Sequence, residues 1–149
     1  MWRDFEEVIN FAMQKEAGAA ALYEEAAKLS KRSEAKAMFD ELAAEERRHR
    51  ETLGKLERKD VSRYTLERIS DMKMSEYMRD VEFRRDMEYQ DILILAIKRE
   101  EKSRNLYTDL AAHTDDPELK KLFRALAQEE AKHKLKLETE YDEYVLTEN

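Results

Sequence analysis

The sequence predicts an all-α protein, a bundle of four long helices arranged as two antiparallel hairpins. Only two of its 149 residues are Gly and one is Pro, so residues that break helices are nearly absent. Apolar residues recur at helical spacing along most of the chain. The chain also repeats itself, because residues 8–53 align with 92–137 without a gap and with 14 of 46 positions identical. This repeat predicts two hairpins related by an internal two-fold pseudo-symmetry.

The first half of the chain predicts two helices joined by a short turn. An apolar stripe runs through Arg3–Leu29, and the polar segment Ser30–Ser33 follows it with a turn and a candidate N-cap. The second helix is expected to continue to about Arg58. Because the connection is short, these two helices should pack antiparallel to each other.

The second half repeats this arrangement. A helix is predicted from about Glu88 to Ala112, and another from Pro117 to near Tyr144. The boundary between them is marked by Asp115 and Asp116 followed by Pro117, an acidic cap with Pro at the first helical position. The second hairpin should therefore resemble the first in both length and packing.

Residues 59–87 form the predicted crossover between the hairpins. A helix of about 25 residues is about 38 Å long, and this stretch can span that distance. We expect one domain over residues 1–149, with repeat halves at about 1–58 and 88–145. The methionines and aromatics of Met72–Met87 should cover the bundle or pack on a partner chain, which favours a homodimer, with exchange of helices left open.

Composition excludes several classes of function. The net charge is −7 with acidic and basic residues interleaved, so no basic stripe for nucleic acid is present. No apolar run approaches the length that spans a membrane, and the N-terminus lacks the profile of a signal peptide, so we expect a cytoplasmic protein. The absence of Cys excludes disulfides, thiolate zinc sites and iron–sulfur clusters. Any metal must be held by oxygen and imidazole nitrogen.

The strongest functional signal is a Glu-x-x-His pair in each half of the repeat. Glu46 and His49 lie on the same helix face as the apolar residue Leu42, and Glu130 and His133 repeat this placement. Each preceding helix adds one carboxylate to its apolar stripe. These two carboxylates are Glu16 and Glu100.

Four carboxylates and two imidazoles are thus predicted to converge in the interior of the bundle. Ionised carboxylates buried without partners are strongly unfavourable, whereas two divalent cations would cancel their four charges. Carboxylate oxygen with imidazole nitrogen suits iron or manganese. The alternative is that these residues are solvated faces of charged helices. Glu45, Glu129 and Glu101 are neighbouring candidates, but the phase of the stripe favours Glu46, Glu130 and Glu100.

Other residues on the same face have two interpretations. Tyr23 and Tyr107 lie seven residues after the lone carboxylates and are candidate catalytic residues, as hydrogen-bond donors that orient ligands or as radical traps. They could equally be amphipathic core tyrosines. Gly18 is interpreted as a position that admits close approach of a neighbouring helix.

These motifs resemble the rubrerythrin group of the ferritin-like di-iron carboxylate superfamily. The resemblance covers essentially the whole chain and is carried by Lys15-Glu16, Leu22-Tyr23, Leu42–His49 and Leu126–His133. It implies a ferritin-like bundle with two iron ions, Glu46 and Glu130 as bridging ligands, and terminal ligands from four other residues. These are Glu16, Glu100, His49 and His133.

The chain departs from rubrerythrins in two respects. It has no Cys, so it lacks the four-cysteine rubredoxin module that relays electrons. It also carries Ser103 where rubrerythrins place an additional Glu, and Ala19 at the repeat-related position. The ligand exchange associated with that Glu during peroxide turnover is therefore not implied here.

The leading hypothesis is a non-haem di-iron oxidoreductase that reduces hydrogen peroxide or dioxygen with electrons from an external donor protein. Manganese or a mixed metal pair is left open. The alternatives are a ferroxidase or iron-handling subunit, and a structural bundle stapled by its metal site. A storage shell needs a large oligomer, so the mass in solution would distinguish the first alternative.

Overall fold

The computed structural model describes residues 5–58, 77, 83–84 and 86–148, and four long helices lie within these residues. They are α1 (Phe5–Leu29), α2 (Ser33–Arg58), α4 (Tyr89–Ala112) and α5 (Pro117–Glu148). No strand occurs among the described residues. The predicted all-α class is therefore confirmed, and most of the predicted crossover 59–87 lies outside the described residues.

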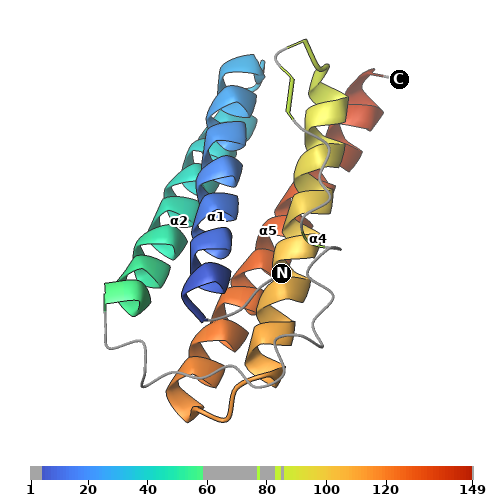
Figure 1. The fold of residues 1–149 in the computed structure, drawn as a ribbon. Coiled ribbons are helices and arrows are strands. Elements are labelled where there is room, and N and C mark those ends of the chain that lie inside the picture. The colour runs from blue at the N-terminus through green and yellow to red at the C-terminus, as the bar shows by residue number, and fades with distance from the viewer. Residues whose placement is uncertain (1–4, 59–76, 78–82, 85, 149) are drawn as a thin grey trace.

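The helices form two antiparallel hairpins, α1 with α2 and α4 with α5 (Figure 1). Contacts are most extensive within each hairpin, while α1 contacts α4 and α2 contacts α5 less extensively. In Figure 1, α2 ends at the opposite end of the bundle from the start of α4. This placement of the two helix ends is the one found in a ferritin-like bundle with a long crossover.

The described helix boundaries agree with the predicted ones to within one residue except at the end of α5, and the predicted start at Arg3 lies outside the described residues. This helix was expected to end near Tyr144, but α5 continues to Glu148. No Gly or Pro stops it there, and Tyr141 and Tyr144 pack against the apolar cluster at the start of α4. At the other end of α5, Asp116 accepts a hydrogen bond from the backbone N–H of Leu119 at 3.0 Å, as an N-cap does.

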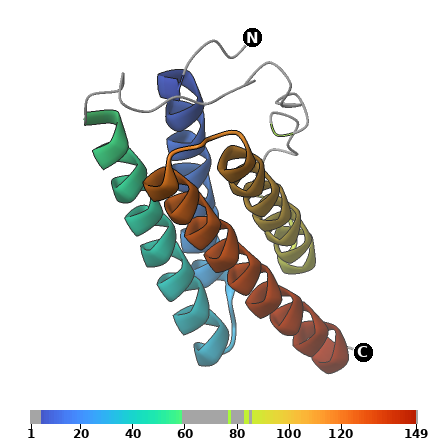
Figure 2. The same cartoon turned by 90° about the horizontal axis from the view of Figure 1, so that it is seen from below.

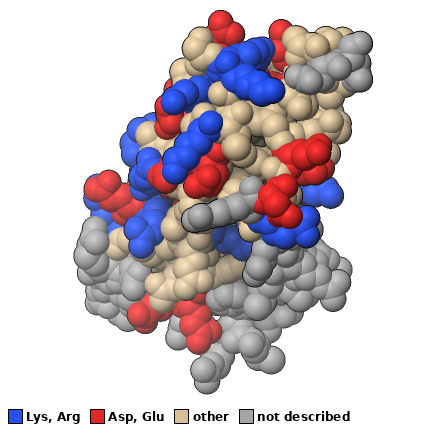
Figure 3. Space-filling model, turned by 90° about the horizontal axis from the view of Figure 1, so that it is seen from above, with Lys and Arg blue, Asp and Glu red and all other residues tan. Residues whose placement is uncertain are grey.

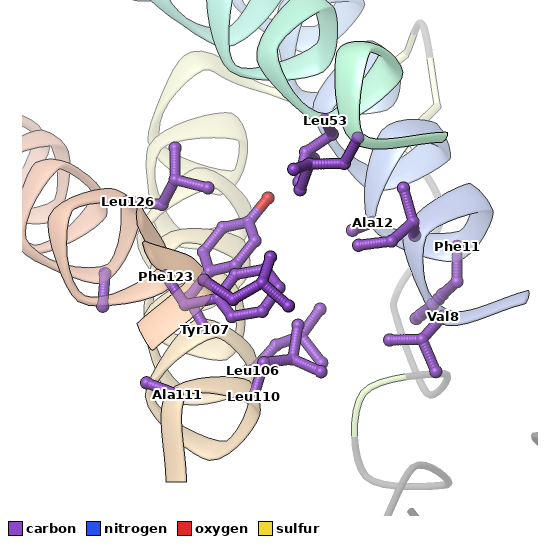
Figure 4. Packing of buried hydrophobic residues seen from close by; sticks show 14 of the residues in the cluster. Val8, Phe11, Ala12, Leu53, Leu106, Tyr107, Leu110, Ala111, Phe123 and Leu126 are labelled. Carbon is purple, nitrogen blue, oxygen red and sulfur yellow. The ribbon is translucent and has the colours of Figure 1, made fainter. Parts of the chain in front are cut away.

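The core consists of two apolar clusters, one toward each end of the bundle. The first joins the start of α1 to the end of α4 and includes Val8, Leu53, Leu110 and Phe123 (Figure 4). The second joins the end of α1 to the start of α4 and includes Phe39. The two hairpins lie side by side around this interior (Figure 2). Burial of these side chains supplies the main stabilisation of the bundle.

A polar layer separates the two clusters at the same level of every helix. On α1, Glu16 lies between Ala12 of the first cluster and Ala19 of the second. On α4, Glu100 lies between Ala96 of the second cluster and Leu106 of the first. The order of the clusters is reversed between the hairpins, as a two-fold axis through the polar layer requires.

The surface shown in Figure 3 carries Lys, Arg, Asp and Glu side chains interspersed with one another. Large apolar side chains are exposed at Leu135 and Leu146, both on α5. Among the described helices, none is both long enough and apolar enough to cross a membrane.

Candidate metal centre

All six predicted ligand residues are buried in the polar layer, each by at least nine-tenths of its surface. Glu16 comes from α1, Glu100 from α4, and each Glu-x-x-His pair from α2 or α5. The exposed fraction is 1% for Glu16, Glu46 and Glu100, 0% for Glu130, 5% for His49 and 2% for His133. Charged side chains are almost never this buried without partners. The interpretation of these residues as solvated faces of the helices is therefore wrong.

Two overlapping groups of four side chains lie in this layer. In each group the four candidate ligand atoms lie within 4.8 Å of one another. One group is Glu16, Glu46, His49 and Glu130, and the other is Glu46, Glu100, Glu130 and His133. Glu46 and Glu130 belong to both groups. Two cations placed here would share these two carboxylates, and each would keep one further carboxylate and one imidazole.

The polar atoms that face the centre of the layer lack hydrogen bonds. His49 Nδ1 lies 2.9 Å from Glu130 Oε1, and His133 Nδ1 lies 2.7 Å from Glu46 Oε1, yet neither nitrogen makes a hydrogen bond of good geometry. The same holds for one oxygen each of Glu16, Glu46 and Glu100, and for both oxygens of Glu130. Buried polar atoms normally find partners. Oxygen and nitrogen atoms left facing one point fit a divalent cation such as iron or manganese.

Two tyrosines hold the outer carboxylates across the hairpin interface. The hydroxyl of Tyr23 on α1 donates to Glu100 on α4, and the hydroxyl of Tyr107 on α4 donates to Glu16 on α1. Figure 4 shows the hydroxyl of Tyr107 pointing away from Leu110. Each tyrosine therefore fixes one oxygen of a carboxylate and leaves the other oxygen facing the centre.

The surroundings of the two tyrosines are also repeat-related. Tyr23 stacks on Phe39 with ring centroids 6.1 Å apart, and Tyr107 stacks on Phe123 at 6.4 Å. Burial, followed by the charge of Glu100, raises the pKa of Tyr23 well above its usual value. Burial, followed by the charge of Glu16, does the same to the pKa of Tyr107. Both hydroxyls therefore keep their protons at neutral pH and act as donors.

The histidines are held by two carboxylates that the sequence analysis treated only as competing ligands. His49 Nε2 pairs with Glu129 on α5, and His133 Nε2 pairs with Glu45 on α2. The two rings stack with centroids 5.7 Å apart. Carboxylates that accept from the outer ring nitrogen direct the other nitrogen at a metal. The repeat preserved both residues, but only the packing of α2 against α5 shows that each serves the histidine of the opposite hairpin.

Burial and mutual repulsion favour the protonated form of the shared carboxylates when no cation is present. Burial, followed by the charges of Glu100 and Glu16, raises the pKa of both Glu46 and Glu130 well above the usual value. Burial also tends to raise the pKa of Glu16, but its close polar contacts with Glu46 and His49 outweigh burial and lower that pKa. Cations binding here would therefore displace protons.

The same carboxylates favour the charged form of the imidazoles. Burial by itself would lower the pKa of His49, but the close approach of Glu130 and Glu16 to its inner nitrogen and the charges of both raise it to about 11. His133 also has a raised pKa, because the polar contact with Glu100 and the charge of Glu100 outweigh its burial. A cation would replace the proton on the inner nitrogen of each ring.

The structure places two other residues outside this centre. Glu101, the neighbour of Glu100, is exposed and lies 3.5 Å from Lys134 on the surface. Gly18 was interpreted as a point of close helix approach, and this interpretation is wrong. A Cβ atom added at Gly18 would meet no atom within 4 Å.

Comparison with known families agrees with this geometry. The family model described as Rubrerythrin matches residues 6–89 and 91–149. The chain belongs to the rubrerythrin family. The rubrerythrin match spans the four helices and all six buried residues of the centre. No curated protein sequence matches the chain significantly.

Two solved structures are similar to this rubrerythrin family member. A candidate ferritin-like diiron-carboxylate protein from Thermotoga maritima has a TM-score of 0.74 at 23% identity, covering 95% of this chain and 97% of that one. A hypothetical protein from Pyrococcus furiosus has a TM-score of 0.69 at 28% identity, covering 92% of this chain and 87% of the other. The first likeness shows a shared ferritin-like fold. None of the 149 residues is Cys, so no part of this sequence can form a four-cysteine iron site.

Proposed function

We propose that this rubrerythrin family member is a non-haem di-iron protein that reduces hydrogen peroxide or dioxygen. The observation that carries the proposal is the pair of overlapping ligand groups, which share Glu46 and Glu130. A pair of ferrous ions held there would supply the two electrons that break an O–O bond. Iron is proposed over manganese from the family, and the donor set fits either metal.

The chain's own residues would position the metals and compensate charge. Two shared and two outer carboxylates carry four negative charges, which match two divalent cations. Tyr23 and Tyr107 would hold the outer carboxylates in place by donating hydrogen bonds. The apolar clusters on both sides keep bulk water from the layer, which strengthens electrostatic interactions inside it.

Continued turnover would need electrons from outside these 149 residues, because they contain no Cys and so cannot hold a rubredoxin-type centre. We propose an external electron-donor protein as a partner. A homodimer and a cytoplasmic location remain predictions from the sequence. The Met72–Met87 segment that suggested the dimer lies largely outside the described residues.

The test is metal analysis of protein purified without oxygen, followed by rapid mixing of the iron-loaded, reduced protein with peroxide or with oxygen. We expect two iron ions per chain and reoxidation by peroxide faster than by oxygen. The matched variants are Glu46→Gln in the centre and Glu41→Gln, which is exposed on the same helix. Glu46→Gln should lose iron binding and reoxidation, and Glu41→Gln should keep both.

Two results would contradict the proposal. One is a preparation that takes up only trace iron under these conditions. The other is a loaded protein whose iron is not oxidised by peroxide or oxygen on any time scale relevant to turnover. A very large oligomer that retains oxidised iron as mineral would favour the iron-handling function instead.

A further inference from the structure

A row of aromatic rings leads from the candidate metal centre to one end of the bundle. Tyr23, whose hydroxyl donates to Glu100, stacks on Phe39 with ring centroids 6.1 Å apart. The ring of Phe39 meets that of Tyr89 edge to face at 6.1 Å, and the ring of Tyr89 lies 4.9 Å from that of Tyr144. Each of the four helices contributes one of these four rings, which we call the aromatic row.

The aromatic row becomes more exposed from the centre outward. Tyr23 is 1% exposed and Phe39 0%, whereas Tyr89 and Tyr144 are both half-buried. Tyr89 is the first residue of α4, and Tyr144 lies in the last turns of α5, at the same end of the bundle in Figure 1. The row therefore joins the buried centre to the surface through rings in contact. Of its members, the tyrosines can give up an electron, because an oxidised phenol is stabilised by losing its proton.

Tyr89 has a proton acceptor that lies away from the metal centre. Its hydroxyl donates to Glu140 Oε2 at 2.9 Å, and Glu140 also pairs with Arg32. Burial, opposed by a hydrogen bond from Ser30 but reinforced by Glu140, raises the pKa of Tyr89. The neutral phenol is therefore the form present at rest. Because an oxidised phenol is a strong acid, a carboxylate in hydrogen-bond contact can take its proton as the electron leaves.

The internal repeat indicates that this tyrosine–carboxylate pair is not needed for the fold. The inner pair of stacked rings is present in both halves of the chain. At the positions related to Tyr89 and Glu140, however, the other half carries Phe5 and Leu56, two buried members of the first apolar cluster. Apolar residues usually stabilise a protein as well as a buried polar pair in the same place does. A hydroxyl and a carboxylate at one end only thus favour a chemical role over a packing role.

We propose that Tyr89 is an electron relay, which gives one electron to the candidate metal centre through Phe39 and Tyr23 and its phenolic proton to Glu140. This proposal rests on the proposed function, because it supplies an electron to the same centre. Reduction of dioxygen to two molecules of water breaks the O–O bond and takes four electrons and four protons. Two electrons come from the ferrous pair, which becomes ferric, one from Tyr89 and one from an external one-electron donor. The four protons come from solvent.

The relay serves dioxygen rather than peroxide. Reduction of hydrogen peroxide to water takes only two electrons, which the ferrous pair already holds. Oxidation of Tyr89 leaves a neutral tyrosyl radical at the half-buried end of the row, next to Tyr144. An external one-electron donor that reaches this end restores the phenol, because it returns the electron while Glu140 returns the proton.

The radical is tested by EPR spectroscopy of rapidly frozen samples. The protein is loaded without oxygen with three ferrous ions per chain, of which the third stands in for the external donor, and is then mixed with dioxygen. We expect the signal of a tyrosyl radical, which narrows when the protein is made with ring-deuterated tyrosine. One equivalent of hydrogen peroxide per chain, in place of dioxygen, should oxidise iron without this signal.

The position of the radical is tested with variants that keep the ring and remove the phenol. Tyr89→Phe should lose the radical although its iron is still oxidised by dioxygen. The matched control is Tyr77→Phe, which changes a buried tyrosine of the first cluster whose hydroxyl donates to Asp109. This control should form as much radical as wild type, and so should Tyr144→Phe.

The proton acceptor is tested with Glu140→Gln and with Glu138→Gln, an exposed position of the same helix. A glutamine can still accept the hydrogen bond, but it does not take up the proton. Glu140→Gln should therefore form less radical than wild type, and Glu138→Gln should form the same amount. Equal yields in these two variants would overturn the role of Glu140.

The outcomes separate this inference from the proposed function. The relay is overturned if Tyr89→Phe keeps the radical, if Tyr77→Phe or Tyr144→Phe loses it, or if wild-type iron is oxidised without any tyrosyl radical. In each of these cases the iron is still oxidised, so the proposed function stands. Iron that neither dioxygen nor peroxide oxidises would contradict the proposed function, and the relay would fail with it.

Discussion

At the scale of single residues, the centre depends on hydrogen bonds that cross between the hairpins. Tyr23 and Tyr107 each reach a carboxylate on the other hairpin, and Glu45 and Glu129 each reach a histidine there. Every such contact occurs twice, once in each direction. Each contact joins two different positions of the repeat. It can therefore occur twice only if both halves of the chain carry both residues, and the repeat does carry them in both halves.

Removal of either tyrosine hydroxyl should weaken the fold and the site together. In Tyr23→Phe and Tyr107→Phe a buried carboxylate loses its donor, which costs about 1–3 kcal/mol. We expect this loss in denaturant unfolding of the metal-free protein, together with weaker metal binding. Tyr144→Phe, a half-buried tyrosine of α5, is the control. Unchanged stability in both variants would show that the hydroxyls do not support the carboxylates.

Removal of the carboxylates behind the histidines should act mainly on metal affinity. Partners of this kind are worth about 10- to 100-fold in affinity, so we expect a weakening in this range for Glu45→Ala and for Glu129→Ala. The exposed residues Glu41 and Glu138, replaced by Ala, serve as controls on the same helices. Titration with Fe(II) or Zn(II) measures the effect. Affinity equal to that of the control variants would contradict the role assigned here.

At the scale of helices, the two hairpins are alike but not identical. Glu140 on α5 pairs with Arg32 in the α1–α2 turn and accepts a hydrogen bond of 2.9 Å from Tyr89 at the start of α4. It therefore ties three elements together at one end of the bundle. The repeat-related position is Leu56, a buried apolar residue. This tie is a feature of one half only.

Replacement of Glu140 should loosen that end of the bundle without affecting the metals. The residue is 7% exposed while Arg32 is more than a third exposed, so solvent screens part of the interaction. We expect Glu140→Gln to reduce the free energy of unfolding by about 1 kcal/mol, with metal affinity unchanged. Hydrogen exchange should increase at the start of α4 and not in Glu138→Gln. A loss of metal binding in Glu140→Gln would be inconsistent with this local role.

At the scale of the whole molecule, the polar layer makes stability depend on metal and pH. Without cations, the layer favours the protonated forms of His49 and of the shared carboxylates Glu46 and Glu130, because the pKa values of all three are raised. The folded state thus binds protons that the unfolded state releases at lower pH. For His49 this window runs from about 6.5 to about 11. The stabilisation that comes from protonated His49 is fully present below this pH range, and it is lost as the pH rises through the range.

The metal-free protein should therefore become less stable between about pH 6 and about pH 9. Bound metal replaces these protons, so the stabilisation by metal should grow over the same range. Thermal unfolding of metal-free and zinc-loaded protein across this range measures both trends. A Tm of the metal-free protein that is constant or rises with pH would show that the layer does not hold these protons.

The sequence by itself determined the helices and the residues of the centre. Few breakers and helical periodicity located the helices, because helix formation depends on neighbours along the chain. The repeat and the apolar stripe singled out Glu46 over Glu45 and Glu130 over Glu129, because burial on a helix follows its phase. The end of α5 was missed, since the packing of Tyr141 and Tyr144 that extends it is a contact with another helix.

Only the tertiary structure decided which side chains meet across the hairpins and where space remains. The crossed partners of the tyrosines and histidines are separated by 77 to 91 residues along the chain, so no local pattern pairs them. The space around Gly18 could not be predicted from the sequence either, because it depends on how α1 lies beside α4. Periodicity fixes the face on which a residue lies, whereas the distance between two faces depends on the packing of all four helices.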